Sequence, residues 1–178
     1  MNFTSTPLAG AYLVDLEPRK DDRGFFARTW CQKEFEEHGL NPRLVQSSVS
    51  FNIKKGTWRG MHYQASPHQE AKLVRCTAGA IHDVIVDLRP HSPTFRQHFT
   101  ALLSATNRRM LYVPEEFAHG FVTLEDNTEV SYQISEFYAP ESARGFRWND
   151  PFFDIRLPRE VSVISERDRA YPDFRAPT

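Results

Sequence analysis

The fold of this chain is decided by residues 71–89, AKLVRCTAGAIHDVIVDLR. Two runs rich in β-branched and apolar residues, Ala71–Cys76 and Ala80–Arg89, predict strands. Between them, Thr77-Ala78-Gly79 predicts a tight hairpin. In the second run, apolar residues occupy both odd and even positions, which alternate between the two faces of a strand. We therefore expect this strand to be covered on both faces, by a second sheet or by a partner subunit.

Short strands are predicted further along the chain as well. Residues 128–138 alternate between apolar residues on one face and polar residues on the other, which is typical of a half-buried strand. Tyr132 and Tyr138 fall on the same face of it. Phe99–Leu103 and Met110–Val113 add two more strands.

One helix is predicted over Cys31–His38, closed by Gly39 and with Phe35 facing inward. The chain contains 12 prolines, and those in the second half cut it into pieces that suit strands better than helices. Its 178 residues suit one domain. We predict an all-β, double-sheet jelly roll with one or two short helices, as a single domain over residues 1–178 with an extended C-terminal tail.

The bulk composition argues against several classes of function. The formal charge is -1, from 22 basic and 23 acidic residues, whereas a nucleic-acid binder needs a basic face. No apolar run reaches the roughly 18 residues of a membrane span, and no signal peptide is visible, so we expect a cytoplasmic protein without a membrane partner. Cys31 and Cys76 are too few for a disulfide framework and lack zinc-site spacing.

Two of the seven histidines have neighbours that suggest chemistry. His62 lies in Arg59-Gly60-Met61-His62-Tyr63-Gln64, where glycine allows close backbone approach, arginine suits a phosphate and histidine suits a base near neutral pH. His119 lies in residues 114–121, a turn-to-strand passage flanked by phenylalanines. Lys72 and Tyr132 lie on predicted strands and are further candidates.

A metal site is not expected among these residues. Metal-binding jelly rolls usually offer an H-x-H pair with a carboxylate, and a further histidine after P-x-G-x-x-H. Here Gln64 breaks the pair, and Glu116 stands where the second motif has glycine. Loss of one ligand from so small a set leaves too weak a site for Zn²⁺ or Fe²⁺.

The same motifs, taken in order, resemble a known family. Eight segments from about residue 20 to residue 170 match the dTDP-4-dehydrorhamnose 3,5-epimerase family in register. They are Arg23–Phe26, Arg59–Gln64, Lys72–Arg75, Asp83–Arg89, Ser92–Thr94, Phe117–Phe121, Trp148–Pro151 and Ser165–Asp168. The resemblance implies a homodimeric, cupin-type jelly roll that acts on a nucleotide-diphosphosugar, whose sugar is a 4-keto-6-deoxysugar, without metal or organic cofactor.

The resemblance also implies roles for single residues. His62 matches the family's catalytic base, Tyr132 its proton donor, and Asp168 the carboxylate paired with the base. The other matching positions bind substrate: Lys72 and His119 line the sugar pocket, Arg23 and Arg59 contact the diphosphate, Tyr138 stacks on the nucleotide base, and Gln46, Ser48, Arg28 and Arg167 are further substrate-binding candidates.

These residue types suit proton transfer beside a ketone. A carbon acid of this kind is weak, so the charge growing on the ketone oxygen needs a fixed donor, and Lys72 is the candidate. Such a donor is typically worth roughly 3–4 kcal/mol of the barrier. His62 can take the proton while Asp168 holds its ring, and Tyr132, on a different strand, can return a proton to the opposite face. None of these steps requires a cofactor.

Three departures from the family pattern fall on the nucleotide side. Arg28 and Ala143 each stand where the family usually has glutamate, and Gln46-Ser47-Ser48 replaces Gln-x-Asn. Thymine offers an N3–H that an acid can accept, whereas cytosine presents acceptors that suit the N–H groups of arginine. We therefore expect a CDP-linked sugar to be preferred over a dTDP-linked one.

Two alternative functions fit part of the pattern. A 3,4-ketoisomerase of a nucleotide sugar has a similar jelly roll, but it tends to carry a histidine pair where this chain has His62 and Gln64. A non-catalytic sugar-nucleotide binding module has no need of an opposed base and acid, yet His62, Tyr132 and Asp168 are all present. Epimerisation at C3, C5 or both is the interpretation that these residues favour.

Overall fold

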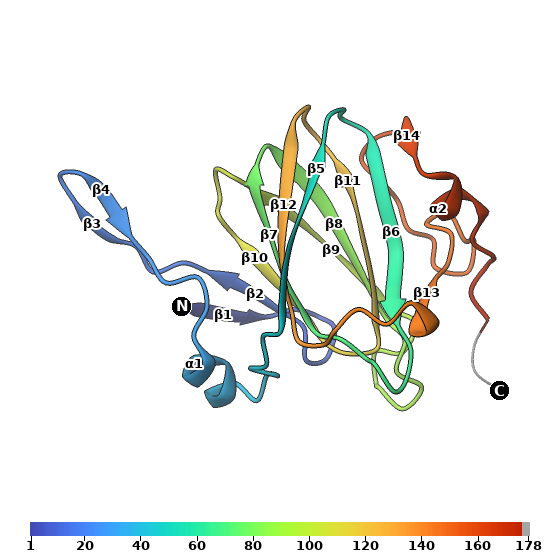
Figure 1. Cartoon of the computed structure of the whole chain (residues 1–178), viewed down its shortest axis with the longest axis horizontal. Helices are drawn as coiled ribbons and strands as arrows, with labels where there is room; N and C mark the ends of the chain where they lie inside the picture. Colours follow the sequence, from blue (N-terminus) through green and yellow to red (C-terminus); the bar gives the residue numbers. More distant parts are fainter. Residues whose placement is uncertain (176–178) are drawn as a thin grey trace.

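The computed structural model describes residues 1–175, which form two facing sheets and a two-stranded arm (Figure 1). The first sheet has the order β1 (Asn2–Ser5), β2 (Tyr12–Asp15), β10 (Met110–Val113), β7 (Lys72–Ala78), β12 (Thr128–Ile134) and β5 (Gln46–Asn52). The second has the order β13 (Ala143–Gly145), β6 (Thr57–Gln64), β11 (Phe117–Thr123), β8 (Ala80–Asp87) and β9 (His98–Ser104), with β14 (Val163–Ile164) pairing β6 in parallel.

The remaining elements are short. The arm consists of β3 (Arg19–Asp21) and β4 (Gly24–Phe26), and it projects away from the sheets at the left of Figure 1. The helices are α1 (Gln32–Glu37) and α2 (Glu166–Ala170), with one 3₁₀ turn at Pro140–Ser142. The predicted all-β class with one or two short helices is therefore confirmed. Residues 1–175 contain no helix with the length and apolar character needed to cross a membrane.

The hairpin predicted at Thr77-Ala78-Gly79 is wrong, although both strands exist. β7 pairs with β10 and β12, while β8 pairs with β9 and β11 in the opposite sheet. Both edges of each strand are thus occupied by other partners, and the chain passes from one sheet to the other at Gly79, between the two strands. Gly79 allows this crossing because its φ is +70° and a Cβ there would lie 2.4 Å from Thr128 Oγ1.

Strand β8 is covered on both faces, as its sequence predicts. Ile81 and Ile85 point into the core between the sheets, with Leu103, Leu111 and Val130. The opposite face carries Val84, Val86 and Leu88, which pack on the chain's own C-terminal segment through Phe146, Phe153 and Ile155. The covers are therefore a second sheet and a segment of the same chain.

Two further predictions are confirmed in part. The helix predicted over Cys31–His38 is α1, with these two residues as its caps and Phe35 buried. The strand predicted over residues 128–138 ends at Ile134, so Tyr138 lies in the loop that follows the strand and not on the strand itself. The C-terminal tail, expected to be extended, contains α2.

The C-terminal cover is expected to contribute strongly to stability. Phe153→Ala removes a ring that is only 4% exposed, and such core truncations typically cost about 3–5 kcal/mol of unfolding free energy. Its neighbour Phe152 is 51% exposed and serves as the matched control, since Phe152→Ala should cost less than about 1 kcal/mol. Urea unfolding of the two variants measures the difference. Equal losses would contradict the packing described here.

Candidate active site

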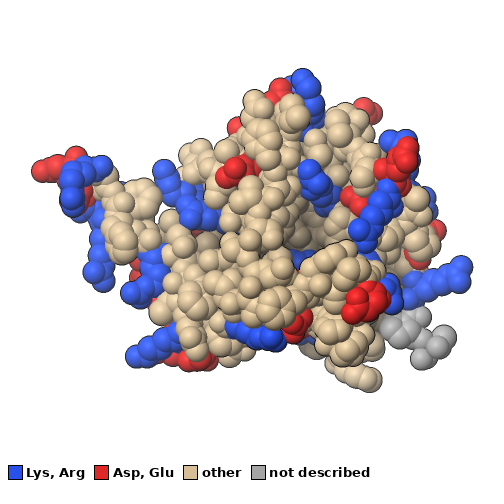
Figure 2. Space-filling view, in the orientation of Figure 1, with Lys and Arg blue, Asp and Glu red and all other residues tan. Residues whose placement is uncertain are grey.

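A cavity of about 380 Å³, open to solvent, lies between the two sheets on the side of β5 and β6. Figure 2 shows a hollow in this face of the molecule, with basic side chains around it. The interior of the sandwich is thus divided, with the apolar core on one side and this polar cavity on the other. Its lining comes from both sheets: Gln46, Ser48, Ser50, Lys72, Tyr132 and Ile134 from the first or its edge, Arg59, His62, His119 and Phe121 from the second, and Glu70 and Tyr138 from loops.

A bulge in β6 brings Arg59 and His62 to the same cavity. In a regular strand, residues three apart point to opposite faces. Here His119 pairs with His62 and Phe121 with Arg59, so three steps on β6 oppose two steps on β11. The extra residue reverses the alternation, as β-bulges do. The arginine and the histidine of the Arg59–Gln64 motif therefore both face the cavity.

Two glycines make this bulge possible. Gly60 has φ +143°, a region that L side chains rarely adopt, and a Cβ on it would lie 2.5 Å from the Cα of Gly120. A Cβ on Gly120 would in turn meet the carbonyl oxygen of Arg59 at 2.9 Å. The close backbone approach expected at Gly60 is therefore present, and it joins β6 to β11 beside His119.

His62 is held by a carboxylate from the far end of the chain. Its Nε2 lies 2.8 Å from Asp168 Oδ1, and Asp168 sits on α2, whose cap Ser165 accepts a hydrogen bond from the Asp168 N–H. Burial favours the neutral carboxyl, but the hydrogen bonds from His62, the Gly60 N–H and Ser165 outweigh it, so the pKa of Asp168 lies below its ordinary value. Asp168 is therefore ionised at neutral pH and orients the ring of His62.

A second histidine–carboxylate pair lies beside the cavity, which His119 lines while Asp83 is buried behind it. His119 Nε2 lies 2.9 Å from Asp83 Oδ2, and both side chains are buried. The ring of Tyr132 stands edge-on to His119, with 6.0 Å between ring centroids. The pKa of Tyr132 lies above its ordinary value, mainly because the side chain is buried and also because the negative charge of Asp83 is near. The phenol consequently stays protonated at neutral pH, as a proton donor must.

Lys72 and Arg59 differ in how their charges are balanced. Lys72 Nζ lies 2.8 Å from Glu70 Oε1, and both side chains are about one-tenth exposed, at 10% and 11%. Arg59 donates instead to a neutral amide, from Nε to Asn52 Oδ1 at 2.7 Å. Within residues 1–175, Arg59 has no carboxylate within 4.0 Å. Its positive charge is therefore free to meet an anionic ligand.

The remaining substrate-binding candidates lie around the cavity mouth. Gln46 and Ser48 line it from β5, and Gln46 Oε1 accepts a hydrogen bond from the Tyr138 N–H at 2.7 Å. That bond holds the loop carrying Tyr138 at the mouth. Arg167 lines an adjoining cavity with Tyr138, Ala143 and Tyr171, and its Nε donates to Tyr171 Oη at 2.9 Å.

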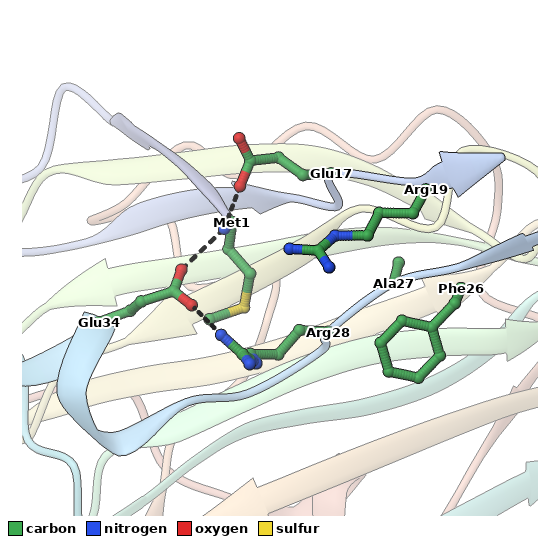
Figure 3. Close-up of a pocket in the computed structure, with 7 residues that line it drawn as sticks. All are labelled: Met1, Glu17, Arg19, Phe26, Ala27, Arg28 and Glu34. Atoms are coloured by element: carbon green, nitrogen blue, oxygen red, sulfur yellow. Dashed lines mark hydrogen bonds and ion pairs between the residues drawn. The ribbon is translucent and has the colours of Figure 1, made fainter.

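Arg23 and Arg28 do not reach this cavity within their own chain. Arg23 lies on the arm and pairs with Asp21. Arg28 lies in a separate cavity at the base of the arm, where it donates to Glu34 Oε1 at 3.0 Å (Figure 3). Glu34 also accepts from the amino group of Met1, so the negative charge beside Arg28 is shared. Arg28 and Ala143, which the sequence places together on the nucleotide side, therefore lie in different cavities of one chain.

Sequence reasoning missed three polar residues that hold the site together: Glu70, Asp83 and Asn52. Asp83 lies on the predicted β8 strand with its side chain facing inward, and an inward carboxylate could have been recognised as needing a partner. Glu70 lies two residues before Lys72, on the same face of an extended segment, which is a usable signal. Asn52 has no signal in the sequence, because its role depends on the pairing of β5 with β12.

The sequence matches known proteins along almost the whole chain. A family model described as dTDP-4-dehydrorhamnose 3,5-epimerase matches residues 5–176. The Sinorhizobium fredii protein of that name is 41% identical over 177 residues, which are 98% of this chain and 90% of the relative.

Solved structures extend the agreement to three dimensions. The crystal structure of dTDP-4-dehydrorhamnose 3,5-epimerase from Elizabethkingia anophelis NUHP1 superposes with a TM-score of 0.94 at 39% identity, covering 98% of this chain and 96% of that chain. A 3,5-epimerase from Legionella pneumophila, in complex with dTDP-4-keto-L-rhamnose, has a TM-score of 0.88 at 34% identity, with coverage of 98% and 99%. The cupin-type jelly roll is confirmed by these neighbours, and the chain belongs to the dTDP-4-dehydrorhamnose 3,5-epimerase family.

Proposed function

We propose that this chain epimerises a nucleotide-diphospho-4-keto-6-deoxysugar at C3, C5 or both by proton transfer. The observation that carries the proposal is the opposition of a base and an acid across one cavity. His62 lies on β6 of one sheet, and Tyr132 lies on β12 of the other. A sugar ring held between the sheets would present opposite faces to the two groups, which inversion of a carbon centre requires.

Each step follows from a group in the cavity. Nε2 of His62 is engaged by Asp168, so Nδ1 is left to take the proton from the carbon beside the ketone. The C–H electron pair forms the enolate, whose oxygen is met by the ammonium of Lys72. Tyr132 then gives its proton to the opposite face of the same carbon. Solvent returns a proton to the phenolate and removes one from the imidazolium, which restores the site.

The balance of charges supports a diphosphate substrate. His62, His119 and Lys72 are each paired with a carboxylate, whereas Arg59 is bonded to a neutral amide. An arginine fork matches the geometry of phosphate oxygens. Arg59 would therefore hold the diphosphate at the end of the cavity bordered by β5, and the sugar would extend toward His62.

Gln64 favours epimerisation over 3,4-ketoisomerisation. This position carries the second histidine expected of the isomerase, but here the amide is buried and fully used by the backbone. It donates to the carbonyls of His68 and Phe137 and accepts from the N–H of Ala139. Gln64 thus shapes the loop before Tyr138 and offers no proton-transfer group to the cavity.

A homodimer is part of the proposal. Strand β5 is at the edge of its sheet and exposes Val49 and Phe51 on its outer face, and the arm exposes Phe25 and Phe26. Exposed apolar residues beside an unpaired strand edge are typical of a surface that associates. A second copy could cover them and could also bring its Arg23 and Arg28 to the neighbouring cavity, which neither residue reaches in its own chain.

His62→Ala should abolish exchange of substrate protons with solvent at every carbon, because one base begins each epimerisation. The measurement is deuterium incorporation at C3 and C5 of a nucleotide-linked 4-keto-6-deoxysugar in deuterium oxide. Binding of the nucleoside diphosphate should change little, since Arg59 is intact. His98→Ala, on an exposed part of β9, is the control. Exchange at the wild-type rate in His62→Ala would rule out His62 as the base.

Tyr132→Phe should separate proton removal from inversion. The base still works, so deuterium exchange with retained configuration persists while the inverted product falls by about 10²-fold or more, in line with the usual contribution of a general acid. Nuclear magnetic resonance of the product distinguishes the two outcomes. If inversion proceeds at the wild-type rate, another group or a water molecule supplies the proton.

Arg28→Glu tests whether a second copy brings Arg28 to the cavity and whether Arg28 there selects CDP over dTDP. If a second copy brings Arg28 to the cavity, the wild-type dimer should bind CDP more tightly than dTDP, and the variant should reverse this order because an acid can accept the thymine N3–H. Calorimetric titration with both nucleotides measures the ratio, and sedimentation of the same sample should give twice the chain mass of 20.7 kDa. Arg156→Glu, on an exposed loop, is the control. An unchanged ratio would remove Arg28 from the nucleotide site.

A further inference from the structure

We infer that Glu70 is a positioning residue for the reaction, acting through Lys72. The inference rests on the proposed function and extends it to a residue that the motifs do not include. Glu70 lines the cavity of His62 and Tyr132 and also the adjoining cavity of Arg167. Its Oε1 lies 2.8 Å from Lys72 Nζ, and neither side chain is more than about one-tenth exposed, at 11% and 10%.

The backbone fixes both ends of this pair. Glu70 and Lys72 flank Ala71 in an extended segment, so their side chains leave on the same face. Ala71 itself is anchored to Ser135 by two hydrogen bonds: its N–H donates to Ser135 Oγ at 2.8 Å, and its carbonyl accepts from the Ser135 N–H at 3.0 Å. Lys72 then enters β7 between Val113 and Ile134. The segment is thus tied at the point from which both side chains project.

The lysine needs such a partner because its stem is flexible. Four methylene groups carry about 2 kcal/mol of rotamer entropy, and an ammonium is a point charge without the fixed fork of arginine. A donor stabilises an enolate well only if it is already in place when the charge develops. The carboxylate of Glu70 occupies one of the three N–H groups of Lys72 and leaves two for the ketone oxygen.

The pair of Glu70 and Lys72 also neutralises the charge of the part of the cavity where the sugar is proposed to lie, near His62. With Glu70 present, Lys72 brings no net charge to the cavity, so among the described residues that line it Arg59 carries the unbalanced positive charge. The diphosphate is therefore directed to Arg59 and not to the ammonium that must meet the sugar. Without Glu70, Lys72 would be a second attraction for phosphate in a partly buried cavity, and its donor geometry would be lost.

Glu70→Ala should therefore lower kcat by about tenfold, a fraction of the 10²–10³ that removal of a whole oxyanion donor costs. Affinity for the nucleoside diphosphate alone, measured by calorimetry with dTDP and CDP, should not fall, since Arg59 is unaffected and Lys72 gains an unpaired charge that attracts phosphate. Glu70→Gln keeps an acceptor oxygen for Nζ and should recover most of kcat. Glu37→Ala removes a carboxylate from an exposed lysine pair on α1 and is the matched control.

A double-mutant cycle separates positioning from a general structural effect. If Glu70 acts through Lys72, adding Glu70→Ala to Lys72→Ala should cause no further loss of the exchange rate in deuterium oxide. Additive losses, or a Glu70→Ala variant with wild-type kcat, would overturn the inference. Absence of exchange in the wild-type chain would instead overturn the proposed function, so the two failures are distinguishable. Equal unfolding midpoints for Glu70→Ala and wild type check that the fold is intact.

Discussion

The bulge at Gly60 is the constraint on which the rest of the site depends. It adds one residue to β6 opposite β11, and this extra residue turns Arg59 and His62 to the same side. Gly120 has to lie opposite, because any side chain on either glycine would push the two strands apart. An anion-binding group and a base therefore share one cavity only where two strands approach more closely than ordinary residues allow.

Around this bulge, the cavity is built from pairs of opposite charge. Asp168 holds His62, Asp83 holds His119 and Glu70 holds Lys72, so most of the charge brought between the sheets is balanced locally. Burial of unpaired charges would be costly, and paired charges with additional hydrogen bonds reduce that cost. Arg59 differs from these groups because it is bonded to a neutral amide and not to a carboxylate. Its unpaired positive charge suits the proposed substrate, which carries two phosphates.

The sequence predicts the strands better than it predicts their partners. Alternation of apolar residues shows that β8 is covered on both faces, and that prediction is confirmed. The same stretch suggests a hairpin between β7 and β8, which the fold replaces with a crossing between sheets. Periodicity reports how a strand is buried, whereas a short turn sequence does not reveal whether the next strand stays in the same sheet. The alternation likewise continues to residue 138, so it does not predict that β12 ends at Ile134.

Sequence patterns were sufficient to predict the all-β class, the family resemblance, and His62, Lys72 and Tyr132 as candidates for proton transfer. These features are local, since they depend on composition, alternation and short motifs. The structure adds contacts that no motif indicates, such as the pair of Asp83 and His119 across 36 residues, and it gives the geometry of the pair that the resemblance implied, Asp168 and His62, across 106 residues. It also separated Arg28 from the cavity, by placing it at the base of the arm. Contacts between side chains distant in the sequence depend on which strands pair and on which segment covers a sheet. Strand pairing and coverage depend in turn on how the whole chain packs, which short motifs do not show.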